Sequence, residues 1–260
     1  MAYRNPRYMV DHALRDRGDE NVFVSGEDPE TPKVRLADGM VARPFRFDSI
    51  ATDHYVAVDL SATPASYARA IIPAGHTLAS AAWVIEQSAS AGFSSPTTLG
   101  SGTFAAGTAL LDLTFTASTQ RYLRLRISTS GLWTLHELYF TNSRTTTRGP
   151  DPNWVDTPVV NVNVTTMRSG EEYGHRIGEQ RQEISYTYNR MASADWDVFA
   201  DLLTATSDGA EPFYLDRTDD GLPPMMVRMV SPPARAQDRP NPRALGETYR
   251  VALLMRESLA

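Results

Sequence analysis

The chain has no cysteine among its 260 residues, which excludes disulfide bonds and cysteine-based metal sites. No run of about 18 apolar residues is present, so we expect no membrane span. The N-terminal sequence MAYRNPR has no apolar signal core, and we expect no Sec-type secretion. Without disulfide bonds, stability must come from packing, either within the chain or together with partner chains.

Lysine is almost absent, since Lys33 is the only one and the other permanently charged basic residues are arginines. The net charge of −6 argues against general nucleic-acid binding, which requires a basic surface. Arginine suits flat, bidentate contacts at interfaces. A genome that favours arginine explains the same bias, and both readings stay open.

The motifs of known catalytic and cofactor sites are also missing. There is no nucleophile elbow, and the Gly100–Gly102 segment lacks the lysine and helix of a phosphate-binding loop. The five histidines are too widely spaced to suggest a zinc site. We expect no enzyme activity, cofactor or metal. These histidines are His12, His54, His76, His136 and His175.

Two groups of carboxylates deserve comparison with functional sites. The first surrounds Arg217 but lacks the spacing and distal glutamate of an EF-hand, so we interpret it as a solvated turn. The second flanks a glycine-broken segment, residues 170–178, that we interpret as an exposed hairpin loop with a structural role. The first group is Asp216, Asp219 and Asp220; the second is Glu171, Glu172, Glu179 and Glu183, with Asp195.

What the chain does contain is strict apolar alternation. In RYLRLRI, residues 121–127, Leu123, Leu125 and Ile127 share one face and the arginines lie on the other. This period of two predicts a strand with one buried face. Residues 55–60 and 132–140 show the same pattern.

Many short strands with almost no helix predict a sandwich or jelly roll between residues 31 and 143. The Ser/Gly/Ala/Thr-rich stretch 88–107 predicts loops and offers Phe93 and Phe104 as its aromatic residues. Trp83 and Trp133 fall inside strand patterns, which favours burial in the core.

The segments YVAVDL (residues 55–60), IIPAGH (71–76), RYLRLRI (121–127) and ELYF (137–140) resemble the discoidin, or galactose-binding-like, family of jelly-roll modules. The resemblance implies a jelly roll over residues 31–143. The paired cysteines of many secreted members are absent, which suggests a relative assembled inside the cell. The sugar-binding aromatic residues of lectin-like members have no clear match, so we expect weak or absent glycan binding and leave the ligand-binding residues unknown.

The C-terminal part is separated from this region by a Pro/Gly-rich stretch, residues 144–153, predicted to be a linker. Residues 159–164, 183–189 and 248–257 alternate like strands. Residues 194–203 carry Trp196, Phe199 and Leu203 at helical spacing, with Ser193 as the expected N-cap and Gly209 as the stop. We also expect strands at 212–215 and 225–230 and a proline-rich loop at 231–242.

The order of these C-terminal elements is similar to that of tail-tube-like and distal tail proteins of long-tailed bacteriophages. In those proteins the tube-like domain usually precedes the accessory domain, whereas here the jelly roll comes first. The resemblance implies a virion protein, assembled in the host cytoplasm, that forms a ring, most simply a hexamer, and contacts tail-tube and tail-tip proteins.

We therefore predict a mainly β protein with four parts: an N-terminal arm (1–30), a discoidin-like jelly roll (31–143), a linker (144–153) and a tail-tube-like β-sandwich with one helix (154–260). The predicted function is structural and non-enzymatic, in the distal tail, tail tip or baseplate. The main alternative is a carbohydrate-binding protein that contacts a host-surface glycan; a glycosidase accessory protein ranks lowest, because no catalytic carboxylate pair stands out.

Overall fold

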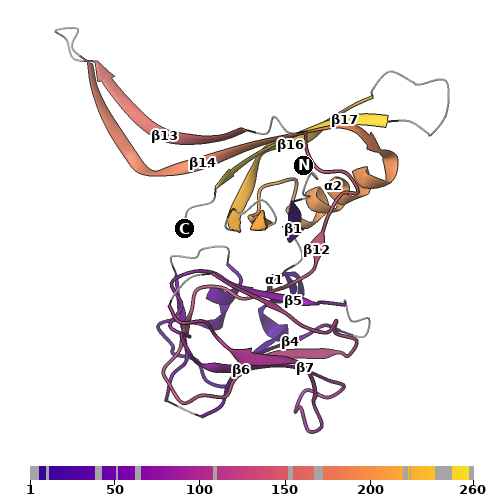
Figure 1. Cartoon of the computed structure of the whole chain (residues 1–260). Helices are drawn as coiled ribbons and strands as arrows, with labels where there is room; N and C mark the ends of the chain where they lie inside the picture. The colour runs from indigo at the N-terminus through magenta and orange to yellow at the C-terminus, as the bar shows by residue number, and fades with distance from the viewer. Residues whose placement is uncertain are drawn as a thin grey trace. The chain divides into compact units, whose positions relative to one another are not determined.

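A computed structural model describes residues 6–9, 12–38, 43–50, 52–61, 66–107, 110–151, 155–166, 172–218, 222, 224–237 and 248–257. The chain divides into two compact units, which we describe separately. Residues 11–143 form the first, here called the jelly-roll unit. Residues 1–10 and 144–259 form the second, here called the hairpin unit (Figure 1).

The larger sheet of the jelly-roll unit is five-stranded, in the order β2-β4-β9-β6-β7. All of its pairings are antiparallel. Its strands are β2 (Val22–Val24), β4 (His54–Asp59), β9 (Tyr122–Ile127), β6 (Ala82–Ser88) and β7 (Thr97–Thr103).

Two smaller sheets and three short helices complete this unit. One sheet is β11-β5-β8 and the other is β10-β3. Their strands are β11 (Tyr139–Thr141), β5 (Arg69–Ile72), β8 (Leu111–Thr114), β10 (Thr134–Leu135) and β3 (Phe45–Arg46). The helices are α1 (Ala13–Arg17), η1 (Asp19–Asn21) and η2 (Lys33–Leu36).

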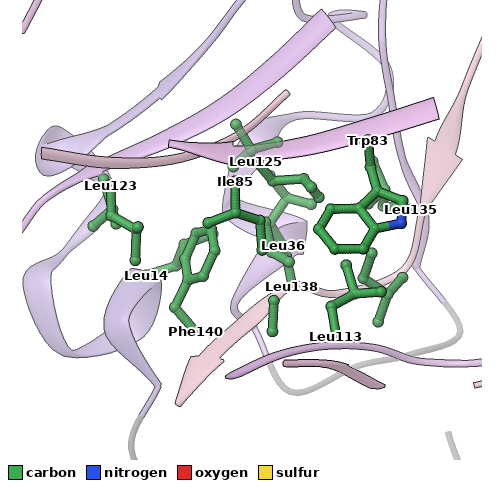
Figure 2. Close-up of a cluster of buried hydrophobic side chains, with 14 of the residues drawn as sticks. Leu14, Leu36, Trp83, Ile85, Leu113, Leu123, Leu125, Leu135, Leu138 and Phe140 are labelled. Atoms are coloured by element: carbon green, nitrogen blue, oxygen red, sulfur yellow. The ribbon is translucent and has the colours of Figure 1, made fainter. Parts of the chain in front are cut away.

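The core of the jelly-roll unit lies between these sheets (Figure 2). Leu123, Leu125 and Ile127 are at most 1% exposed and pack with Ile85 and Phe140, as the alternation predicted. Leu14 of α1 belongs to the same cluster. Residues 11–30 thus contribute to this core. The jelly-roll unit therefore begins near residue 11, and not at residue 31 as predicted from the sequence.

Strand β7 lies inside the stretch that we predicted to be loops. Its glycines explain the difference, because a Cβ on Gly102 would lie 3.1 Å from Cζ2 of Trp83. A Cβ on Gly100 would lie 2.9 Å from the Cβ of Phe115. The ring of Trp83 requires small residues on β7, and these residues remove the apolar alternation that would have identified the strand.

The hairpin unit contains a seven-stranded sheet in the order β12-β1-β15-β16-β17-β14-β13. Strand β1 (Arg7–Met9) pairs with β15, far along the chain. The jelly-roll unit is therefore inserted between β1 and β12 of the hairpin unit and does not simply precede it. The other strands are β12 (Ser143–Arg144), β13 (Val155–Thr166), β14 (Glu172–Ala192), β15 (Phe213–Asp216), β16 (Met225–Gln237) and β17 (Thr248–Glu257).

Helix α2 (Ser193–Ala205) matches the predicted helix, but its ends differ from the prediction. Ser193 is the first helical residue, and the N-cap Ala192 makes no side-chain capping bond. The helix ends before Gly209, which lies in the following turn with φ of 90°. Phe199 and Leu202 pack on one face of the sheet, against Tyr188, Val251 and Leu253 among others.

Strand β16 continues through Pro232 and Pro233, where we predicted a loop. The pairing of β16 with β17 shifts register between Met229 and Ser231 and again between Ser231 and Ala234. These irregularities accommodate the prolines, which cannot donate to a regular ladder. The predicted fold class is confirmed as mainly β with several sheets. The predicted C-terminal β-sandwich is not found, because the described strands of the hairpin unit form one seven-stranded sheet with α2 packed on one face. Within the described segments, no helix is long and apolar enough to cross a membrane.

Candidate assembly interface

The most distinctive feature of the hairpin unit is the length of its β13–β14 hairpin. The two strands pair from Val155 and Ser185 at the root to Thr166 and Glu172 near the tip. Strand β17 pairs with β14 only from Glu183 onward. Residues 159–166 and 172–182 thus form a two-stranded ribbon beyond the rest of the sheet (Figure 1). At about 3.3 Å per residue, the eight β13 residues of the ribbon extend roughly 26 Å.

The ribbon has an open edge on each side. Strand β13 is terminal in the sheet, and the β14 segment 172–182 pairs only with β13 among the described strands. An isolated two-stranded hairpin is at best marginally stable in water. Each open edge presents backbone N–H and C=O groups that can pair with another chain.

The sequence along the β13 edge lacks the usual protection against such pairing. Natural edge strands carry charges or prolines that block association. Here Asp156 and Pro158 lie near the root, and residues 159–166, VVNVNVTT, have neither charge nor proline. The opposite edge of the sheet, β12, has only two residues and cannot match this length. A partner for the β13 edge must supply another long extended segment.

The root of the ribbon is fixed by a buried aromatic cluster. Ile184, Tyr186 and Tyr188 alternate into the core, each at most 2% exposed. The hydroxyls of Tyr188 and Tyr8 are hydrogen-bonded to each other, and burial raises the pKa of both. Tyr188 also makes an edge-on ring contact with Phe199 of α2. The ribbon thus extends from the part of β14 that is fixed by contacts with Tyr8 of β1 and Phe199 of α2.

The carboxylates around the hairpin have structural roles where they are described. Glu183 pairs with Arg256 at 2.8 Å. Asp195 is buried and accepts hydrogen bonds from the backbone N (2.9 Å) and hydroxyl (2.7 Å) of Thr147. It therefore fixes the predicted linker to α2 rather than serving only as a first-turn anion. The side chains of Glu171, Glu172 and Glu179 lie outside the described residues.

The aspartate group at residue 216 is not a simple solvated turn. Asp216 is 2% exposed, pairs with Arg7 at 2.8 Å and accepts hydrogen bonds from the N and Oγ1 of Thr218. Arg217 is also buried and pairs with Asp156 at 2.7 Å. These pairs connect β15 with β1 and with the root of β13. Asp219 and Asp220 lie outside the described residues.

Each described histidine makes a hydrogen bond to a backbone or side-chain group of the fold. His54 contacts Ser25 Oγ (3.3 Å) and Gly131 O (3.1 Å), and His136 contacts Gly75 O (3.1 Å). Nδ1 of the buried His76 accepts from Leu78 N at 3.2 Å. His12 caps α1. Across the described residues no cluster of potential metal ligands is present, and the side chain of His175 is outside them.

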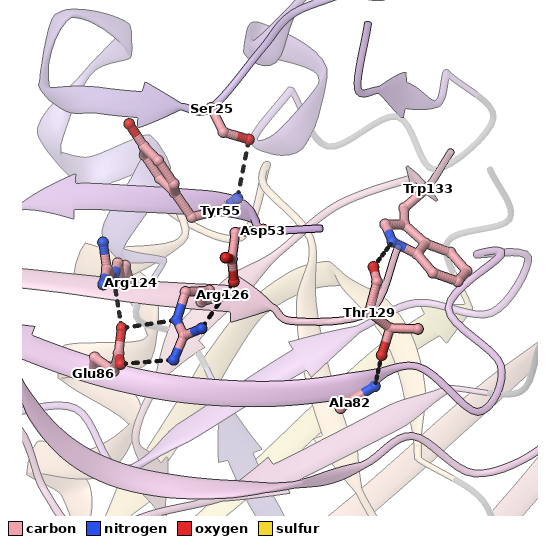
Figure 3. Close-up of polar contacts among 9 residues, drawn as sticks. All are labelled: Ser25, Asp53, Tyr55, Ala82, Glu86, Arg124, Arg126, Thr129 and Trp133. Atoms are coloured by element: carbon pink, nitrogen blue, oxygen red, sulfur yellow. Dashed lines mark hydrogen bonds and ion pairs between the residues drawn. The ribbon is translucent and has the colours of Figure 1, made fainter. Parts of the chain in front are cut away.

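On the outer face of the five-stranded sheet, the arginines of β9 form a paired network (Figure 3). The buried carboxylate of Glu86 receives Arg124 Nε at 2.6 Å and Arg126 Nη2 at 3.2 Å. Arg126 also pairs with Asp53 at 2.9 Å. The guanidinium of Arg124 lies 4.1 Å from the ring centre of Phe93. A buried charge requires such partners, so this network serves the fold.

The aromatic residues of the jelly-roll unit are mostly inaccessible. Phe93 and Phe104 are 8% and 3% exposed, and Trp83 is 9% exposed. Trp133 is half-buried and its Nε1 donates to Thr129 O at 3.0 Å (Figure 3). Phe93 and Phe104, the two aromatic residues of the stretch where we considered sugar stacking, are thus both buried.

Comparison with known proteins finds no matching family model and no matching curated protein. Solved structures similar to this chain include a mutant of chitosan-binding module 1 from the chitosanase/glucanase of Paenibacillus sp. IK-5, with 21% identity over 51% of this chain and 99% of that one, and a TM-score of 0.43.

Two further similar structures are family 32 carbohydrate-binding modules. The module of AlyQ, in complex with 4,5-unsaturated mannuronic acid, has 19% identity over 50% of this chain and 95% of that one (TM-score 0.38). The module of C. perfringens NanJ, in complex with galactose, has 13% identity over 46% and 92% (TM-score 0.39). None of the three is a tail protein, so the tail role stays a prediction.

Proposed function

We propose that this protein is a non-enzymatic structural protein of a bacteriophage tail whose copies join through the β13–β14 ribbon. The observation that supports this best is a ribbon of roughly 26 Å with an open edge on each side. Its β13 edge, residues 159–166, lacks the charges and prolines that protect natural edge strands, so this edge promotes aggregation unless it is paired.

The two edges are complementary in direction. When copies stand side by side in the same orientation, the β14 segment 172–182 of one copy runs antiparallel to β13 of the next. The ladder thus continues from copy to copy as an antiparallel sheet. Such a head-to-tail contact closes into a ring when the rotation per copy allows it, and closure pairs both edges of every ribbon. The tail-tube-like order of elements favours six copies.

Shortening the ribbon tests this function. Val159 pairs with Arg181 in the register, so an Asn-Gly turn can replace residues 160–180. The shortened variant keeps all β14 residues that pair with β17, so we expect a folded monomer. The wild-type chain should form a ring, as measured by light scattering and electron microscopy.

A larger deletion provides the control. Replacing residues 11–142 with a short Gly/Ser link removes the inserted jelly-roll unit and keeps the ribbon. This variant should still assemble. A wild-type chain that is monomeric at every concentration, or a shortened variant that assembles equally well, would refute the proposal.

A further inference from the structure

The seven-stranded sheet has a second face that α2 does not cover. Tyr186, Tyr188, Val251, Leu253 and Met255 point into the core with α2. Their neighbours along each strand point the other way and are half-buried or exposed. We call this surface the open face. It comprises Ser185 and Thr187 of β14, Arg250, Ala252, Leu254 and Arg256 of β17, and Arg228 and Val230 of β16.

The open face carries unbalanced positive charge. Arg228 and Arg256 are direct cross-strand partners, an unfavourable arrangement for like charges. Glu183 pairs with Arg256 at 2.8 Å. Neither Arg228 nor Arg250 has a carboxylate partner among the described residues. Because like charges on neighbouring strands destabilise a sheet, we infer that these arginines bind an acidic partner.

Helix α2 presents the opposite charge on its outer side. Ala194, Asp197, Asp201 and Thr204 are exposed at helical spacing, and the exposed Asp208 follows in the next turn. The helix contains no lysine or arginine. Asp201 pairs with Arg144, but Asp197 and Asp208 have no cationic partner in the described parts of the chain. We call this row the acidic stripe.

We propose that the open face of one copy binds the acidic stripe of a second copy. Arg228 and Arg250 lie roughly 20 Å apart along the strands. Asp197 lies about 12 Å before the last residue of α2, and Asp208 follows in the turn after the helix. Both surfaces thus carry two separated charges. Val230, 43% exposed, and Leu254 supply apolar surface between the arginines.

This contact rests on the proposed ring assembly and names a second pair of surfaces that join copies. It is heterologous, because the face and the stripe are different surfaces of one chain. Since the open face and α2 lie on opposite faces of the sheet, the contact stacks one copy on another and does not join the lateral neighbours that share a ribbon edge. Complementary charge of this kind also selects the correct partner and orientation.

Charge reversal on each surface tests the contact. One variant carries Arg228→Glu and Arg250→Glu, and the other carries Asp197→Arg and Asp208→Arg. Each variant alone places like charges together, and we expect its self-association to weaken roughly tenfold or more. In an equimolar mixture, the reversed face of one variant meets the reversed stripe of the other. Mixing should therefore restore assembly.

The control carries Glu30→Arg and Arg43→Glu, two exposed charges of the jelly-roll unit, and should assemble like the wild type. If both reversed variants assemble normally while the shortened-ribbon variant is monomeric, this contact is wrong and the ribbon function stands. If each variant is weakened but the mixture is not restored, the two surfaces do not meet. A monomeric wild-type chain overturns both proposals.

Discussion

Removal of residues 11–30 from the jelly-roll unit should cost it most of its stability. Leu14 and Val22 are 1% and 3% exposed in the core, and strand β2 pairs with β4 through Val22 and Val58. Burying a leucine or valine side chain contributes about 1.5–3 kcal/mol. The two side chains together thus supply roughly 3–6 kcal/mol, before the lost β2 ladder is counted. Single domains are stable by only about 5–15 kcal/mol.

Two fragments make this measurable. We expect residues 11–143 to melt cooperatively by circular dichroism and calorimetry. We expect residues 31–143, which matches the domain boundary inferred from sequence, to be molten or insoluble. Within the longer fragment, Leu14→Ala should lower the free energy of unfolding by about 2–5 kcal/mol, because the surrounding core can only partly collapse.

The control for Leu14→Ala is Arg43→Ala, an exposed change that should alter the free energy of unfolding by less than about 0.5 kcal/mol. Equal unfolding free energies for the two fragments would refute the role that we assign to α1 and β2. So would a Leu14→Ala variant as stable as the Arg43→Ala control.

Three further measurements address the jelly-roll unit. Leu125→Asp should abolish cooperative melting of fragment 11–143, since an unpaired charge in the core costs several kcal/mol; a tolerated change would contradict the facing of β9. Burial lowers the pKa of His12 in the folded chain well below 6.5. As the pH falls below about 6.5, the His12 side chain therefore binds a proton in the unfolded chain before it does so in the folded chain, and the free energy of unfolding should decrease. His12→Asn keeps a capping side chain without titration, and an unchanged pH dependence in chemical denaturation would contradict this assignment. We also expect weak or absent binding on a glycan array, because Phe93 is buried; micromolar binding lost in Phe93→Ala would show the opposite.

The sequence was most informative where one face of an element is buried and the other is in water. The alternation at residues 121–127 and 248–257 and the helical spacing at residues 194–203 all correspond to observed elements. Sequence patterns did not identify strands whose packing requires small residues, because small residues produce no apolar alternation. Apart from Leu99, strand β7 consists of glycine, serine and threonine, and its two glycines lie against the ring of Trp83. No local signal marks such a strand.

The candidate interface was visible only in part. The alternation of residues 159–164 indicated a strand, and the glycines at 170–178 suggested a loop, whereas the structure places residues 172–178 within β14. The glycines obscured the length of the ribbon, and only the pairing of β14 with both β13 and β17 shows where the sheet ends and the ribbon begins.

The insertion of the jelly-roll unit could not be read from the sequence, because it depends on three residues. Strand β1, Arg7–Met9, is too short to show a period, and its assignment rests on contacts made more than 200 residues away, such as the pair of Tyr8 with Leu215. Once β1 lies beside β12 in the sheet, both ends of the inserted unit leave from adjacent strands. A domain attached in this way can be removed or exchanged without cutting the sheet that carries the ribbon. The edges, the open face and the acidic stripe all belong to the hairpin unit, so the surfaces that we propose for assembly lie outside the inserted unit.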